Sequence, residues 1–169
     1  MVIDMLLWAM VLTALYTDIT KRKIYNATSV TGMAAGLGLN LYERGWEGLV
    51  MSGTGLFLGL LLFILPFILG GMGAGDVKLL AAIGAIKGPQ FVWQVALGSI
   101  LAGGLIAVVI LIKQKRFLSS LKNIGMSIYT LVLAKDGHSL KKLDQAEYNE
   151  AFPYGVAIAA GTLAAALMG

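Results

Sequence analysis

Charged residues are so sparse along the chain that the intervals between them outline its apolar segments. Five uncharged runs of 13 to 28 residues separate clusters of charge. A helix needs about 20 apolar residues to cross a bilayer core, with a lower limit near 17. The first run reaches that limit only together with the start of the chain. We predict six membrane helices, at residues 1–17, 27–42, 49–69, 77–87, 90–112 and 153–168.

The fourth predicted segment is the shortest. Its 11 residues cover only about half of a hydrocarbon core at about 1.5 Å per residue. Gly88-Pro89 separates it from the fifth segment, since this pair breaks helices. A helix that starts at membrane depth must follow irregular backbone, which is tolerated only under a cover of protein or water. The glycine-rich residues 70–76 supply that backbone.

Basic residues predict the orientation of the chain. Eleven of the thirteen Lys and Arg residues lie on one side of the predicted spans, and the exceptions are Arg44 and Lys87. Cytoplasmic loops carry an excess of Lys and Arg, so this side is cytoplasmic. Both termini are then outside.

Composition agrees with a membrane protein and excludes several kinds of site. Hydrophobic residues make up 58% and charged residues 13% of the chain, against about 45–50% and about 25% in soluble domains. The chain has no cysteine and a single histidine, His138, which excludes disulfide scaffolds, thiolate metal sites and multi-histidine metal sites. We expect an all-α polytopic protein in the lipid bilayer, with no metal, cofactor or nucleic acid.

No linker divides the chain, so we predict one membrane-embedded domain over residues 1–169. Residues 113–150 differ from the rest, because they carry seven basic and four acidic residues around an apolar stretch at 123–134. Twelve uncharged residues are too few to span a membrane. We expect a cytoplasmic loop or an interfacial helix there.

Two aspartates lie at predicted span ends. Asp18 ends the first segment and Asp76 precedes the fourth, which places both at the cytoplasmic side. Two neighbouring carboxylates share a proton, so one can act as general base and the other as general acid. Gly73 and Gly75 would let an extended peptide approach Asp76. A purely structural alternative is that Asp76 caps a helix and Asp18 forms an interfacial ion pair with the adjacent basic residues.

Three motifs in this order carry a resemblance to a known family. They are Asp18 followed by a basic turn with Ile24 and Asn26, the sequence GMGAGDVKLLAAIGA at 71–85, and PYGVAIAAG at 153–161. The chain resembles the type IV prepilin leader peptidases, membrane aspartic proteases with a GxGD motif. Tyr25 departs from the proline usual in the family, although Asn26 can still cap the second helix.

The resemblance implies a function and roles for residues. Asp18 and Asp76 would be catalytic, and Gly73, Gly75, Lys78 and Asn26 would position the motif or the substrate. The substrate would be a prepilin-like or preflagellin-like membrane-anchored precursor, cut at the cytoplasmic face of the plasma membrane between its basic leader and its apolar helix. The chain begins almost at the first span and lacks cysteine, so it resembles the short forms that do not methylate their product.

Several alternatives remain open at this stage. Lys78 either stabilises the negative charge of the aspartates or extends to the interface. The acidic residues of the long loop either attract the basic leader or form a solvated surface: Asp136, Asp144, Glu147 and Glu150. Alternative functions are an intramembrane protease of the presenilin or signal-peptide-peptidase type, and a non-enzymatic carrier or assembly subunit that uses the aspartates as ion sites.

Overall fold

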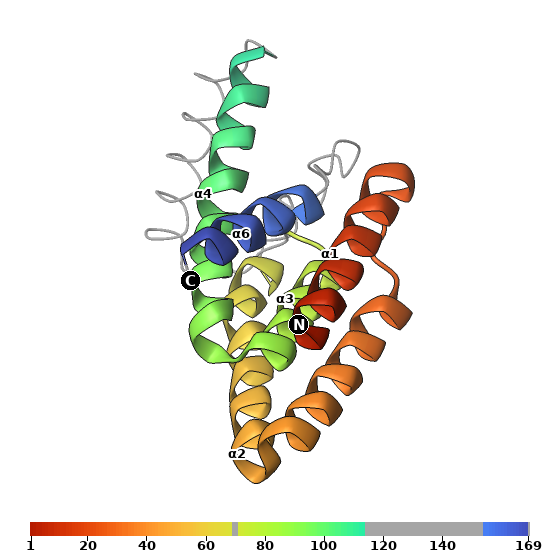
Figure 1. Ribbon diagram of the computed structural model, residues 1–169. Helices are drawn as coiled ribbons and strands as arrows, with labels where there is room; N and C mark the ends of the chain where they lie inside the picture. The colour runs from red at the N-terminus through yellow and green to blue at the C-terminus, as the bar shows by residue number, and fades with distance from the viewer. Residues whose placement is uncertain (69–70, 114–153, 169) are drawn as a thin grey trace, which may run out of the picture. The chain divides into compact units, whose positions relative to one another are not determined.

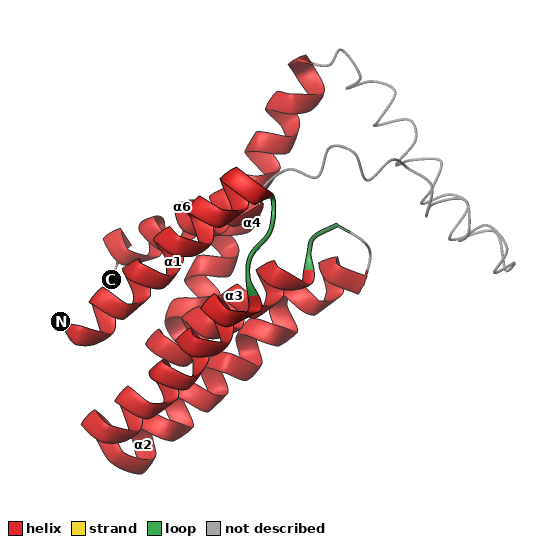
Figure 2. Ribbon diagram, turned by 90° about the vertical axis from the view of Figure 1, so that its right-hand side faces the viewer, coloured by secondary structure: helices red, strands yellow, loops and turns green. Residues whose placement is uncertain are grey.

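The computed structural model describes residues 1–68, 71–113 and 154–168, and these are helical apart from short connections. The helices are α1 (Val2–Lys21), α2 (Asn26–Ile68), α3 (Ala74–Lys87), α4 (Pro89–Lys113) and α6 (Tyr154–Met168) (Figure 1). Within these ranges there is no strand (Figure 2), which confirms the all-α prediction for them. The predicted interfacial helix at 113–150 and the acidic loop residues lie outside the described residues.

The chain forms two compact units. The first comprises Met1–Gly103 and Pro153–Gly169, and the second comprises Gly104–Phe152. Of the second unit, the structure describes the helical residues of α4 up to Lys113. The fold and the site below belong to the first unit.

Each of the six predicted segments corresponds to helix, but two of them are joined in α2. Helix α2 bends at Gly45, whose φ of +61° lies in the left-handed region that glycine adopts most easily. The second half then runs back beside the first, and the hydroxyl of Ser52 donates to the carbonyl of Gly36 at 3.4 Å. Among the described residues, three helices are long and apolar enough to cross a membrane: Val2–Lys21, Asn26–Ile68 and Pro89–Val109.

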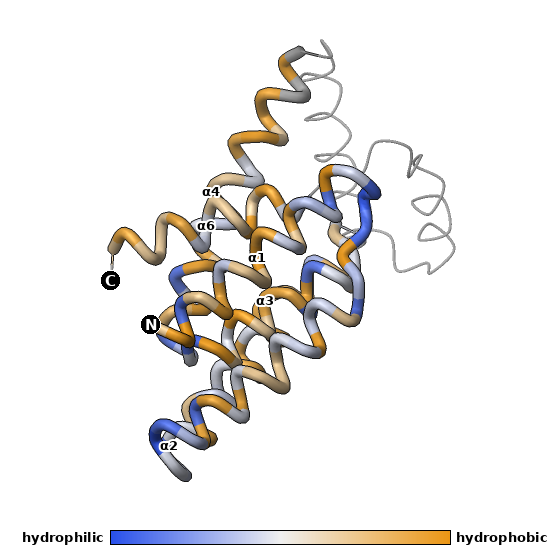
Figure 3. The backbone as a smooth tube through the Cα atoms, turned by 45° about the vertical axis from the view of Figure 1, so that its right-hand side comes forward, coloured by the Kyte–Doolittle hydropathy of each residue, from blue (hydrophilic) through white to orange (hydrophobic). Residues whose placement is uncertain are grey.

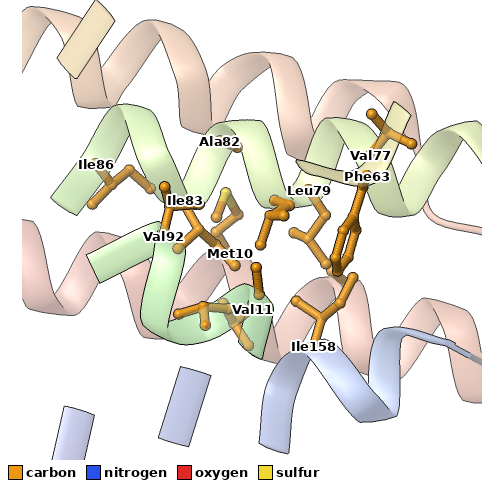
Figure 4. Close-up of a cluster of buried hydrophobic side chains, with 14 of the residues drawn as sticks. Met10, Val11, Phe63, Val77, Leu79, Ala82, Ile83, Ile86, Val92 and Ile158 are labelled. Atoms are coloured by element: carbon orange, nitrogen blue, oxygen red, sulfur yellow. The ribbon is translucent and has the colours of Figure 1, made fainter. Parts of the chain in front are cut away.

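Helix α3 is the most deeply buried element. Side chains of residues 79–86 are buried around its whole circumference, and they pack chiefly against α2 with further contacts to α1 and α6. Figure 4 shows Leu79, Ala82, Ile83 and Ile86 within the buried apolar cluster. The 14 residues of α3 rise about 21 Å, less than a bilayer core of about 30 Å. Protein surrounds most of this short helix, whereas Gly71, Gly73 and Ala74 at its start are exposed.

Hydrophilic residues are concentrated at the ends and the bend of the helices. Apolar residues lie between these ends, both in the interior and on the outer surface. Figure 3 shows hydrophilic residues gathered at the α1–α2 connection and at the bend of α2, with apolar residues between them. Large apolar side chains also face outward on several helices, including Leu12, Phe57 and Leu101. An outer surface of this kind is suited to contact with lipid.

Candidate active site

Asp18 lies in the last turn of α1 and faces the interior, with only 6% of its surface exposed. Helix α1 ends when Arg22 adopts a left-handed conformation (φ +48°), and the Arg22 N–H donates to the Asp18 carbonyl at 2.8 Å. This turn leaves the basic side chains of 21–23 exposed. The suggested ion pair between Asp18 and these residues is wrong, because the ion pairs of the described residues involve only Asp4.

Asp76 lies in the first turn of α3 and is also almost fully buried, at 7% exposure. The sequence analysis suggests Asp76 itself as a helix cap, with the helix starting at Val77. The structure corrects this: Gly73 is the N-cap residue, and the helix begins at Ala74. The N–H of Gly73 donates to Oδ2 of Asp76 at 3.0 Å. The carboxylate therefore lies over the N-terminus of α3, where the helix dipole favours negative charge.

The opposite directions of α1 and α3 bring the two aspartates to the same end of the helices. At the other end, Nζ of Lys87 in the last turn of α3 lies 2.7 Å from Oδ1 of Asp4 in the first turn of α1. Asp18 and Asp76 occupy the opposite ends of these same two helices. Both side chains are almost fully buried at this end. The structure thus places the two aspartates at the same end of α1 and α3.

Helix α6 supplies a contact that the sequence analysis missed. The N–H of Gly155 donates to Oδ2 of Asp18 at 2.8 Å, across 137 residues of sequence. The neighbouring Tyr154 packs edge-on against Phe63 of α2, with ring centroids 5.9 Å apart. The only sequence signal for this contact is the motif at 153–161, to which we assigned no role.

The two glycines of the GxGD sequence differ in their surroundings, because Gly73 is exposed and Gly75 lies against the α1–α2 connection. A Cβ on Gly75 would lie 3.0 Å from Cβ and 3.3 Å from the carbonyl oxygen of Ile24, which is buried in the α1–α2 connection. A Cβ on Gly73 would lie 3.3 Å from Oδ2 of Asp76. Gly75 thus allows the α1–α2 connection to approach the start of α3 closely. The approach of a peptide to Asp76 remains a prediction.

Lys78 and Asn26 form a direct link between α3 and α2. Nζ of Lys78 donates to Oδ1 of Asn26 at 2.9 Å, across 52 residues of sequence. Asn26 is the first residue of α2 and not a cap before it, because the carbonyl of Tyr25 accepts the N–H groups of the first turn. This bond holds the start of α2 near the start of α3, on the side of the two aspartates.

The arrangement is suited to acid–base chemistry by two carboxyl groups. Each aspartate uses Oδ2 to accept one backbone N–H. Among the described residues, no other residue donates a hydrogen bond to these two carboxylates, so Oδ1 of each can hold a proton or contact water or a substrate. No group of three or more acidic or histidine side chains that would suit a metal ion occurs among the described residues.

Comparison with known families identifies the chain. Residues 5–108, more than half of the sequence and including both aspartates, match the type IV leader peptidase family. The chain belongs to this family. The resemblance inferred from the motifs is thereby confirmed. No curated protein and no solved structure matches the chain.

Membership of the leader peptidase family settles the general class of function. The family is one of peptidases and implies membrane-anchored, pilin-like substrates in general. Together with three apolar helices of spanning length, it indicates a membrane protein. The expectations of a protease and of a membrane location are confirmed at this level.

Proposed function

We propose that this chain is a prepilin-type leader peptidase in which Asp18 and Asp76 form an aspartic catalytic dyad. The observation that carries the proposal is the pair itself: two nearly buried carboxylates at the same end of antiparallel α1 and α3. Carboxylates are costly to bury in a membrane protein and are retained there mainly for function. Two such groups within the region matched by a peptidase family favour hydrolysis over ion transport.

The chemistry follows from a shared proton. Two adjacent carboxylates do not both ionise readily, so the pair holds one proton between them. The ionised member takes a proton from water while the water oxygen bonds to the scissile carbonyl carbon. The protonated member donates its proton to the carbonyl oxygen. The resulting tetrahedral diol collapses when the C–N bond breaks. The departing amine takes up the proton that came from water, and one diol hydroxyl returns its proton to the other carboxylate, which leaves a carboxylic acid product and restores the shared proton.

The proposed substrate is a pilin-like precursor with a basic leader followed by an apolar helix. We place both aspartates at the cytoplasmic face of the plasma membrane and both termini outside, in a six-span arrangement. Support comes from the eleven basic residues on one side of the spans and from the shared end of α1 and α3. A bond between a cytoplasmic leader and its membrane helix would then lie at the depth of the dyad.

Cysteine labelling tests this orientation, and the cysteine-free chain gives no background. We expect Arg44→Cys to react with a membrane-impermeant maleimide added outside intact cells. Lys23→Cys, in the basic α1–α2 connection, should react only after the membrane is permeabilised. The reverse pattern would place the aspartates at the outer face and contradict the proposed orientation.

Cleavage of a synthetic precursor in proteoliposomes tests the proposed activity. Mass spectrometry of the products should place the cut between the basic leader and the apolar helix. A cut inside the apolar helix would instead favour an intramembrane protease of the presenilin type. No cleavage, together with proton flux that depends on Asp18 and Asp76, would favour a carrier.

A further inference from the structure

We propose that Gly155 of α6 is a positioning residue for Asp18, and that it fixes which carboxylate oxygens carry the shared proton. The inference rests on the proposed function, because it concerns the geometry of the same dyad. It adds a third helix to a site otherwise formed by α1 and α3. The contact between Gly155 and Asp18 is buried and links residues 137 positions apart.

The hydrogen bond uses a donor that helix geometry leaves free. Helix α6 begins at Tyr154, so the N–H of Gly155 belongs to the first turn, where backbone N–H groups have no partner within the helix. It donates to Oδ2 of Asp18 at 2.8 Å. Asp76 is held in the same way, by the N–H of Gly73 at the start of α3. Two helix N-termini thus each hold one carboxylate of the dyad.

The absence of a side chain at Gly155 is required by the same contact. A Cβ there would lie 2.6 Å from Oδ2 of Asp18 and 3.1 Å from its Cβ and Cγ. These atoms belong to a short side chain that is almost fully buried, so they have little room to move. Any residue other than glycine would therefore push the Asp18 carboxylate away from its present position.

The two hydrogen bonds from backbone N–H groups also make Oδ2 chemically different from Oδ1 in each carboxylate. A backbone N–H only donates, so the Oδ2 atom that faces it acts as an acceptor. A proton on that atom would compete with the N–H for the same lone pairs. The shared proton is therefore held on the Oδ1 atoms, which are also the atoms left to act on water and on the scissile carbonyl. Gly155 acts through Asp18 and does not itself contact the substrate.

Two changes at position 155 separate the hydrogen bond from the steric effect. Gly155→Ala adds the Cβ, whereas an amide-to-ester replacement at residue 155, with glycolic acid in place of glycine, removes only the N–H. In the full-length protein with a synthetic pilin-like precursor, we expect each to lower kcat by about 10-fold or more with little change in KM, because hydrogen bonds to charged groups are the stronger ones. The ester variant decides the question if Gly155→Ala fails to fold.

Gly161→Ala is the matched control on the same helix. A Cβ at Gly161 would lie 2.5 Å from Oγ and 2.6 Å from the backbone nitrogen of Ser99 on α4, so it disturbs packing at least as strongly. It lies about 9 Å further along α6 than Gly155 and does not touch Asp18. We expect the folded fraction of this variant to keep the wild-type kcat.

Three results would overturn the role of Gly155. The first is a wild-type kcat in both position-155 variants. The second is a rise in KM at unchanged kcat in these variants. The third is an equal loss of kcat in Gly155→Ala and Gly161→Ala while the ester variant stays fully active. Failure of the proposed function has a different signature: either the wild type does not cleave the precursor, or Asp18→Asn cleaves it as fast as an active wild type.

Discussion

The close packing of α2 against α3 can be tested with two identical substitutions only two residues apart. Gly55 of α2 faces Gly84 of α3, and a Cβ on Gly55 would collide with the Gly84 carbonyl oxygen and lie 2.8 Å from the backbone carbonyl carbons of Gly84 and Gly88. These are backbone atoms, so no side-chain rotation relieves the overlap. A Cβ on Gly53 would meet nothing within 4 Å. Gly55→Ala and Gly53→Ala therefore differ only in what the added methyl group contacts.

The expected difference in stability follows from this comparison. Replacing glycine by alanine in a helix gains about 0.5–1 kcal/mol, and this gain is common to both variants. Overpacking against atoms that cannot move costs about 1–3 kcal/mol, and only Gly55→Ala incurs it. Gly53→Ala should be more stable than the wild type, and Gly55→Ala should lie about 1–3 kcal/mol below Gly53→Ala.

Unfolding in mixed detergent micelles titrated with sodium dodecyl sulfate measures this difference directly. Because α3 carries Asp76, the folded Gly55→Ala protein should also cleave a precursor more slowly than Gly53→Ala. Equal unfolding free energies for the two variants would refute the reasoning, since they would show that α2 and α3 are not in backbone contact at Gly55.

Two further predictions concern the other end of α3 and the pH dependence of cleavage. The buried amide of Asn40 donates to the carbonyl oxygens of Ile86 at 3.0 Å and Ala85 at 3.3 Å, in the last turn of α3. Asn40→Ala should lose about 1–3 kcal/mol of unfolding free energy, and an unchanged value in the same micelle titration would contradict this role. The rate of cleavage should pass through a maximum with pH, because one carboxyl must be ionised and the other protonated. A rate that stays constant from acidic to basic pH would be inconsistent with a dyad.

The helices and the pairing of the aspartates could be predicted because each depends on a simple physical cost. Charge is excluded from the apolar core of a bilayer, so the gaps between charges outlined the helical segments. The side preference of basic residues placed Asp18 and Asp76 at one level, and the structure brings them to one end of α1 and α3. The two predicted segments on either side of Gly45 are both helical, and the chain reverses direction between them at Gly45.

The contacts that shape the site could not be predicted in the same way. Gly155 holds Asp18 through a backbone N–H, and every residue except proline has that group, so the sequence carries no mark of the donor. The contact of Gly75 with Ile24 could not be predicted, because glycine permits the close approach of any chain and here one approaching chain is the protein's own. The bond between Lys78 and Asn26 depends on the relative placement of two helices, which residue types alone do not specify.

The central claim is that Asp18 and Asp76 together carry out the hydrolysis. Its most direct test is single-turnover cleavage of a pilin-like precursor by Asp18→Asn and Asp76→Asn, each compared with the wild type in the same lipid and checked for folding. The proposal predicts that each substitution alone lowers the rate of cleavage by at least about 100-fold, because acid–base catalysis by one positioned group contributes about 10²–10⁴-fold. Cleavage at close to the wild-type rate by either folded variant would contradict the claim.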